Sequence, residues 1–137
     1  MTFEGSCLCG TVRFEVDGPL DDVSHCHCSM CRKAHGAAFA TYANVPSARH
    51  RFTQGEAALK AYRSSGTVER VFCSQCGSPM LWRDAVHYPG STSFPLGALP
   101  GDVPVPAQRH IFVGSKAAWY EIHDRWPQSD AYSDAPE

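Results

Sequence analysis

Seven cysteines in three short clusters constrain this 137-residue chain more than any other feature. The clusters read Cys7-Leu-Cys9-Gly, Cys26-His-Cys28-Ser-Met-Cys31 and Cys73-Ser-Gln-Cys76-Gly. The first residues, MTFEGSCLCG, lack the basic and apolar regions of a secretory signal, so we expect a cytoplasmic protein. Disulfides are rare in the cytosol, and an odd count leaves one cysteine unpaired. The clusters therefore predict metal binding, redox chemistry or a nucleophile rather than a disulfide framework.

Two of the clusters together offer four ligands for one metal ion. Two residues separate Cys73 from Cys76, which lets a single turn present both sulfurs, and Gly77 can close that turn with a positive φ. Such a turn needs a second pair of ligands. Cys7 and Cys9 can supply it, because residues i and i+2 of a strand point to the same side. This pairing predicts a structural zinc site that joins segments distant in sequence.

The third cluster has three thiols within six residues and no fourth cysteine to complete it. A zinc ion held by Cys26, Cys28 and Cys31 would keep one coordination position open, as catalytic zinc sites do. In one alternative, His25 or His27 is the fourth ligand and this site is also structural. In another, the three thiols hold no metal and serve redox chemistry. Arg32 and Lys33 follow the cluster and could offset its negative charge.

The remaining sequence predicts short β-strands with very little helix. Val12, Phe14 and Val16 alternate with polar residues, and glycine or proline interrupts the chain frequently. We predict strands at residues 11–16, 23–28, 37–45, 59–64, 68–73, 79–83, 91–96 and 110–113, with a hairpin turn at Ser65-Gly66. Short helical turns are expected at residues 29–35 and 115–123, and a loop at 95–106. The expected fold is all-β, with the metal sites at strand ends.

Length and composition set the remaining limits. A chain of 137 residues fits one domain, so we treat residues 1–137 as a single unit. The formal net charge is −2 and there is no basic tract, which argues against a nucleic-acid partner. No window is long and apolar enough for a membrane span.

At its cysteine motifs the chain resembles the glutathione-dependent formaldehyde-activating enzyme (Gfa) family, which includes centromere protein V-like proteins. The resemblance rests on GSCLCGTVRF, CHCSMCRKAHG, RVFCSQCGS and, near the end, HIFVGSKAAW and WPQ. It extends from about residue 5 to about residue 128, leaving residues 129–137 as a C-terminal tail. It implies the family's β-tent, a fold of coiled antiparallel sheets around a structural zinc.

The resemblance also implies roles for the cysteines and a reaction. Cys7, Cys9, Cys73 and Cys76 match the family's structural zinc ligands, and Cys26, Cys28 and Cys31 match its second, labile and catalytic zinc site. The family's reaction condenses formaldehyde with glutathione to S-hydroxymethylglutathione, which is carbon–sulfur lyase chemistry. The expected partners are therefore a small-molecule thiol, with glutathione as the candidate, and an aldehyde. From its proximity to the triad, and because histidine titrates near neutral pH, His27 or His35 is expected to relay a proton.

Two non-enzymatic hypotheses remain open beside the lyase. In the first, both zinc ions only shape a surface that binds a protein or a small thiol. In the second, the chain is a redox or metal-responsive protein in which Cys26, Cys28 and Cys31 alternate between metal and disulfide.

Overall fold

The computed structural model describes residues 1–131 and shows a mainly β fold built from two sheets. The strands are β1 (Thr2–Ser6), β2 (Arg13–Asp17), β3 (Val23–Cys26), β4 (Ala40–Pro46), β5 (His50–Gln54), β6 (Leu59–Ser65), β7 (Val68–Cys73), β8 (Pro79–Asp84), β9 (Ser91–Pro95) and β10 (Gln108–Ile111). The helix α1 spans Ser29–His35, and four 3-10 turns are η1 (Ser47–Arg49), η2 (Glu56–Ala58), η3 (Leu96–Ala98) and η4 (Val113–Ser115). The expectation of short strands with little helix is confirmed.

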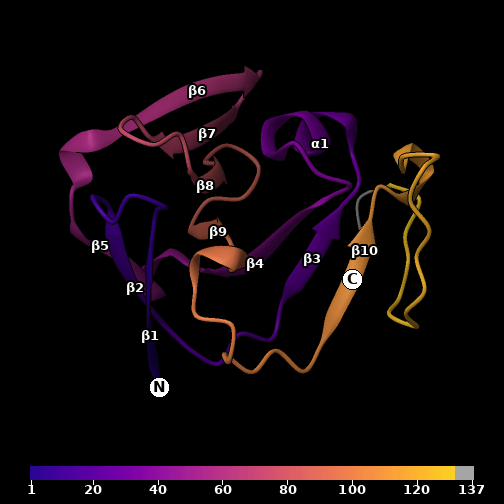
Figure 1. The fold of residues 1–137 in the computed structure, drawn as a ribbon, viewed down its shortest axis with the longest axis horizontal. Helices are drawn as coiled ribbons and strands as arrows, with labels where there is room; N and C mark the ends of the chain where they lie inside the picture. Colours follow the sequence, from indigo (N-terminus) through magenta and orange to yellow (C-terminus); the bar gives the residue numbers. More distant parts are fainter. Residues whose placement is uncertain (132–137) are drawn as a thin grey trace.

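The smaller sheet has the order β1-β2-β5, and the larger sheet has the order β10-β3-β4-β9-β8-β7-β6. Figure 1 shows how the larger sheet curves from β10 on the right to β6 at the top, with the smaller sheet on the left. Neighbouring strands are antiparallel except β10 and β3, which run parallel. This coiled arrangement agrees with the expected β-tent.

The main core lies between the two sheets. Val12, Phe14 and Val16 are almost completely buried, as their alternation predicted, and Phe14 packs against Phe94 of β9 at a ring-centroid distance of 5.3 Å. Met80 of β8 belongs to the same cluster. One face of the large sheet is therefore apolar, and the alternate residues of its strands point to the opposite face.

Several local predictions are confirmed and others are wrong. The helical turn at residues 29–35 and the hairpin between β6 and β7 are present. Residues 115–123 contain the end of η4 and one turn, closed by a hydrogen bond from the Tyr120 N–H to the Ala117 carbonyl, but no α-helix; Lys116 also donates hydrogen bonds to the carbonyls of Ala117 and Tyr120. Strands β1 and β5 were not expected.

The end of the described chain folds back onto β10. Backbone hydrogen bonds join Ser129 to His110, Val113 to Ser129 and Phe112 to Ala131. Residues 132–137, which complete the predicted C-terminal tail, lie outside the described residues. No helix in the described part is long and apolar enough to cross a membrane.

Candidate metal centres and the adjoining cavity

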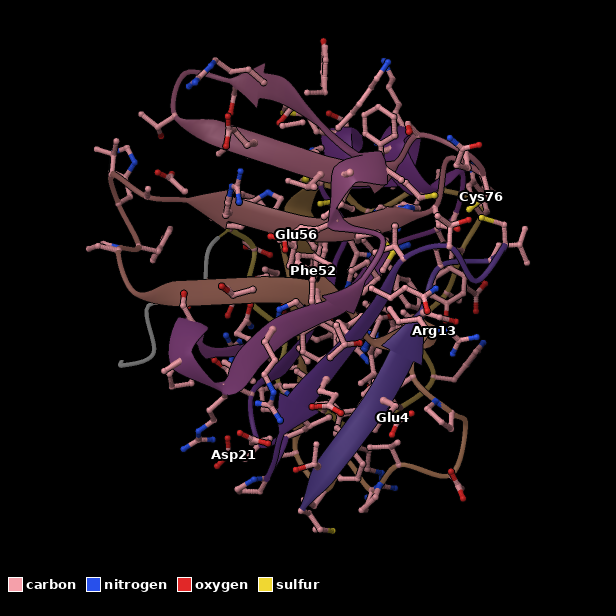
Figure 2. All side chains as sticks on the ribbon, turned by 90° about the vertical axis from the view of Figure 1, so that its left-hand side faces the viewer. Glu4, Arg13, Asp21, Phe52, Glu56 and Cys76 are labelled. Atoms are coloured by element: carbon pink, nitrogen blue, oxygen red, sulfur yellow. The ribbon has the colours of Figure 1, made fainter. Side chains whose placement is uncertain are left out.

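Four cysteines from two distant segments meet at one edge of the smaller sheet. Cys7 and Cys9 lie in the turn after β1, Cys73 ends β7, and Cys76 lies in the turn before β8. Their sulfur atoms all lie within 4.8 Å of one another, and the Cys9 Sγ is 3.7 Å from that of Cys7 and 3.9 Å from that of Cys73. Figure 2 shows Cys76 beside further sulfur atoms at this edge.

These distances fit a tetrahedral zinc ion. Zinc–sulfur bonds of about 2.3 Å place the sulfur ligands about 3.8 Å apart. Hydrogen bonds also favour the ionised ligand form, because contact with the Ser78 hydroxyl lowers the pKa of Cys76 to about 5. Four thiols of this geometry leave no position for a substrate, so the set fits a closed structural site.

The local backbone differs from the prediction for Cys7 and Cys9. We expected an i, i+2 pair on a strand, but both lie in a turn that follows β1. Gly10 and Gly77 have φ angles of 79° and 80°. Glycine adopts this left-handed conformation at low cost, whereas other residues rarely do. The same device therefore closes both cysteine turns, as predicted for Gly77 alone.

The second centre lies where β3 passes into α1. Cys26 ends the strand, and Cys28 caps the helix, its Sγ accepting a hydrogen bond from the Cys31 backbone N–H at 3.3 Å. Cys31 lies in the first helical turn and is buried. The three sulfurs lie within 4.8 Å of one another. The end of β3 and the start of α1 together direct the three thiols toward one point.

The three thiols differ in their tendency to ionise. Hydrogen bonds from Cys26 and Cys31 hold the pKa of Cys28 far below its ordinary value. The Cys28 contact raises the pKa of Cys26 far above it. The contacts within the triad therefore favour ionisation of Cys28 over that of Cys26, and a cation placed between the sulfurs would favour ionisation of all three.

An arginine from a distant strand supplies positive charge at this centre. Arg70 of β7 directs its Nη2 to the Cys31 Sγ at 3.6 Å and its Nη1 to the Tyr42 hydroxyl at 3.3 Å. The Tyr42 hydroxyl lies 2.9 Å from His35 Nε2. Burial raises the pKa of Tyr42 and lowers that of His35, so both are neutral. Sequence reasoning assigned charge compensation to Arg32 and Lys33 and missed Arg70.

Arg32 and Lys33 have other surroundings. Arg32 donates to the backbone carbonyls of His27 and Ser115, and Lys33 is exposed. The guanidinium of Arg32 therefore holds the chain around the helix start and does not contact the thiols. Only strand pairing could have identified Arg70, because 39 positions separate it from Cys31.

A cavity of about 320 Å³ adjoins the triad on the polar face of the large sheet. It is lined by Cys26, Cys28 and Cys31 at one end, by Tyr42, Asn44, Arg70, Trp82 and Ser93 along the sheet, and by Asp22, Ser24 and Arg109 at the far end. A volume near the lower limit of small-molecule sites fits one compact ligand. The triad thus faces a cavity, and the cysteines of the first centre are absent from its lining.

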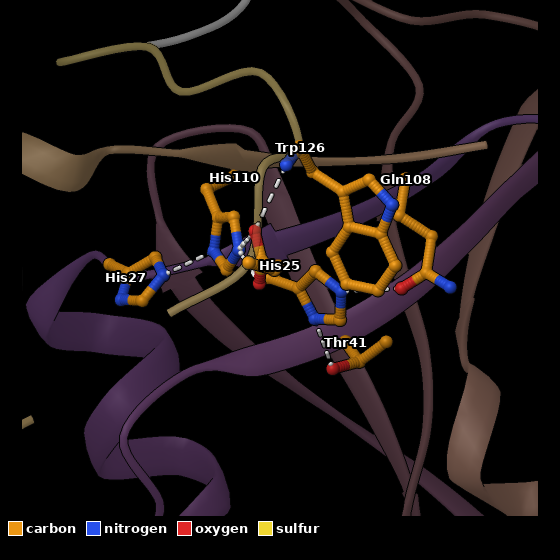
Figure 3. A network of polar contacts seen from close by, with 7 residues as sticks. His25, His27, Thr41, Gln108, His110 and Trp126 are labelled. Carbon is orange, nitrogen blue, oxygen red and sulfur yellow. Dashed lines mark hydrogen bonds and ion pairs between the residues drawn. The ribbon is translucent and has the colours of Figure 1, made fainter. Parts of the chain in front are cut away.

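The histidines beside the triad point away from this cavity. The His27 Nε2 lies 2.8 Å from His110 Nδ1, and the His110 Nε2 lies 2.9 Å from an Asp124 carboxylate oxygen. Figure 3 shows this contact and His25 stacked beside Trp126. His25 also contacts Thr41 and Gln108.

These contacts bear on the alternative in which His25 or His27 is the fourth ligand. Within residues 1–131 no histidine nitrogen joins the sulfur group of Cys26, Cys28 and Cys31. His27 is fully buried and does not line the cavity, whereas His35 reaches it only through Tyr42. Within the described residues, only the three thiols come together at this centre, and His35, rather than His27, lies near the cavity.

Comparisons with known proteins point to one family. Residues 2–115 match the family model described as glutathione-dependent formaldehyde-activating enzyme. A Halomonas elongata protein, provisionally named as such an enzyme, is 36% identical over 135 residues, covering 91% of this chain and 83% of that protein. An uncharacterised lyase of Schizosaccharomyces pombe is 30% identical over 82 residues, which cover 58% of this chain and 56% of that protein. A crystal structure of a Rhodobacter sphaeroides protein superposes with a TM-score of 0.61 at 28% identity, covering 74% of this chain and 91% of that one.

Proposed function

The chain belongs to the glutathione-dependent formaldehyde-activating enzyme family, and we propose that it is a zinc-dependent carbon–sulfur lyase acting on the thiol adduct of a small aldehyde. The observation that carries this proposal is the position of the Cys26, Cys28 and Cys31 triad, which faces a cavity while the other four cysteines close on one another. Glutathione and formaldehyde are the proposed substrates. The proposed setting is the cytoplasm, where reducing conditions keep thiols free.

In the synthetic direction, the thiol sulfur forms a bond to the carbonyl carbon. The carbonyl π electrons move to the oxygen, which takes the proton that the thiol loses. Cleavage of the adduct reverses each change. The protein must therefore hold the sulfur beside the aldehyde and move one proton from sulfur to oxygen.

We assign a zinc ion to each cysteine group. Cys26, Cys28 and Cys31 would hold the labile ion, and Cys7, Cys9, Cys73 and Cys76 the structural one. When bound to the triad, zinc supplies a Lewis acid that lowers the pKa of a coordinated group. Three thiolates and one divalent cation carry a net charge of −1, and the Arg70 guanidinium is placed to balance it.

Tyr42 is the residue that we propose for handling the proton near the carbonyl oxygen. Its hydroxyl lies between Arg70 and His35 and belongs to a side chain that lines the cavity. Because burial raises the pKa of Tyr42, the hydroxyl keeps its proton and can donate a hydrogen bond to a developing oxyanion. The proposal replaces His27, which the fold turns away from the cavity, with Tyr42 and His35.

A direct test follows the exchange of ¹³C-formaldehyde with glutathione by NMR, because the uncatalysed reaction is subtracted in the same experiment. The wild-type chain is expected to accelerate exchange. Cys28→Ser is expected to abolish this acceleration and to keep the wild-type circular dichroism spectrum, since Cys28 is partly exposed and outside the main core. Acceleration by the variant, or none by the wild type, would reject the lyase assignment.

A second candidate uses the same triad for thiol redox or metal-responsive chemistry. Three free thiols within 4.8 Å favour it, because neighbouring thiols can form a disulfide when the metal leaves. Its signature is zinc release under mild oxidant with Cys7, Cys9, Cys73 and Cys76 unmodified. Saturable thiol binding without turnover would instead identify a non-catalytic binding module.

A further inference from the structure

The cavity has a second charged end that the proposed chemistry does not use. Asp22, immediately before β3, accepts a hydrogen bond at 2.6 Å from the Arg109 Nη1 of β10. Both side chains line the cavity, and they are 42% and 28% exposed. Arg70, the third charged residue of the lining, is held at the triad by Cys31 and Tyr42.

The Asp22–Arg109 pair is not saturated by the protein. The Arg109 Nε is buried and has no hydrogen-bond partner, although a guanidinium has five N–H donors. An adjacent carboxylate and guanidinium present opposite charges side by side. This pattern complements a zwitterion, whose carboxylate bonds to the guanidinium while its ammonium bonds to the carboxylate.

The distance from the pair to the triad follows from the strand register. Arg109 lies opposite Ser24 and Ile111 lies opposite Cys26 on the paired strands. At about 3.3 Å per residue, Cys26 is about 7 Å along β3 from Ser24 and about 13 Å from Asp22. The charged groups of Asp22 and Arg109 therefore lie about 7 to 13 Å from the thiols.

A γ-glutamyl thiol has matching dimensions. In glutathione, seven bonds join the sulfur to the α-carbon that carries the free ammonium and carboxylate. An extended chain advances about 1.2 Å per bond, so this arm reaches about 8 Å. A ligand with its sulfur at the triad would thus bring its zwitterionic end to Asp22 and Arg109. The side chains of Ser24, Asn44 and Ser93 line the space between, where an amide needs partners.

We propose that Asp22 and Arg109 form a subsite for the α-amino-acid end of a γ-glutamyl thiol, with Arg109 binding the carboxylate and Asp22 the ammonium. This inference rests on the proposed function for the identity of the ligand. It assigns specificity to the end of the cavity remote from the reacting sulfur. A purely anionic thiol gains less at this subsite, because Asp22 repels it.

The test measures ligand binding to the metal-loaded protein by calorimetry and needs no turnover. The probes are S-methylglutathione, whose blocked sulfur cannot react, and the same molecule without its α-amino group. The variants are Asp22→Asn and Arg109→Gln. Arg51→Gln is the matched control, because Arg51 pairs with Glu15 and Asp17 on the exposed side of the smaller sheet. Circular dichroism checks the fold of each variant; Arg109→Lys replaces Arg109→Gln, and Asp22→Ser replaces Asp22→Asn, if either fails to fold.

The expected result is a coupling between one ligand group and one residue. Loss of the α-amino group should weaken wild-type binding about tenfold, the effect of a hydrogen bond to a charged group, but weaken binding to Asp22→Asn less than twofold. Arg109→Gln should weaken both probes tenfold or more, and Arg51→Gln should bind as the wild type does.

Three results would overturn the subsite: no binding of S-methylglutathione by the wild type, an equal cost of amine loss in the wild type and Asp22→Asn, or unchanged binding by Arg109→Gln. Glutathione–formaldehyde exchange, measured on the same samples, separates this outcome from failure of the lyase proposal. Unchanged exchange in both variants rejects the subsite alone. The expected binding pattern without wild-type exchange supports the subsite and rejects the lyase.

Discussion

Loss of the four-cysteine site should destabilise the whole fold, whereas loss of the triad should not. Cys73 is fully buried in the main core, and Cys9 lies 64 positions before it in sequence. If a metal joins these segments, it restricts the unfolded chain as a cross-link does. For a loop of this length, the chain-entropy relation gives about 4 kcal/mol of stability. The triad joins only neighbouring residues, so its contribution by the same relation is about 2 kcal/mol or less.

The perturbation is therefore Cys73→Ala, followed by the double variant Cys73→Ala/Cys76→Ala. The double variant removes both cysteines that the second segment contributes to the four-cysteine site. We expect the single variant to lose about 2–4 kcal/mol and the double variant at least 4 kcal/mol. For a domain of this size, the double variant corresponds to a fall in Tm of about 15 °C. Cys28→Ser is the control and should change the free energy of unfolding by about 0.5 kcal/mol or less, because serine can accept the Cys31 N–H hydrogen bond and cap helix α1 in place of cysteine.

Thermal and urea unfolding, followed by circular dichroism in excess zinc, measures these differences. A double variant that melts within about 3 °C of the wild type would refute the structural role. A metal cross-link that stabilises the fold by about 4 kcal/mol cannot be removed without a larger fall in Tm. Equal losses in the control and the Cys73→Ala variant would refute the division into structural and working sites.

Two further predictions concern other side chains. Burial lowers the pKa of His50 to about 4, from 6.5, so its stabilising effect is complete above pH 6.5 and disappears as the pH falls toward 4. Allowing for partial solvent screening, the wild type should lose about 2 kcal/mol more than His50→Phe over this range in urea titrations, and parallel curves would contradict this. Arg70→Met should weaken zinc binding at the triad about tenfold in competition with a chromophoric chelator, because a charge-assisted contact to Cys31 is lost; Arg70→Lys should restore part of it. An unchanged affinity in Arg70→Met would show that its charge does not act on the metal.

The sequence identified the local features of this molecule better than the non-local ones. Alternation at Val12, Phe14 and Val16 predicted their shared buried face, and the cysteine spacing predicted both sulfur groups. In contrast, β5 has only exposed and half-buried residues and the one buried residue of β1 is Gly5, so neither strand carries a clear alternation of buried apolar and exposed polar residues. The helical composition of residues 115–123 was misleading, because a segment this short depends on tertiary contacts for its conformation.

The residues of the candidate site that the sequence did not predict are those that strand pairing brings to the cavity. Tyr42, Arg70 and Arg109 come from three different strands and reach the cavity only through the sheet order. Arg70 begins the RVFCSQCGS motif, but neither that motif nor the sequence around Tyr42 and Arg109 indicates that the three side chains face one cavity. Trp82 also lines the cavity and lies opposite Arg70 on the β7–β8 pair.

The central claim is that one chain holds a closed structural zinc and an open, exchangeable one. Zinc content per chain, measured on protein purified without chelator and again after mild chelation, tests this claim most directly. The account predicts two zinc ions at first and one after chelation, with the fold retained and the thiols of Cys26, Cys28 and Cys31 newly reactive. A single ion that resists chelation, or two ions lost together with the fold, would contradict it.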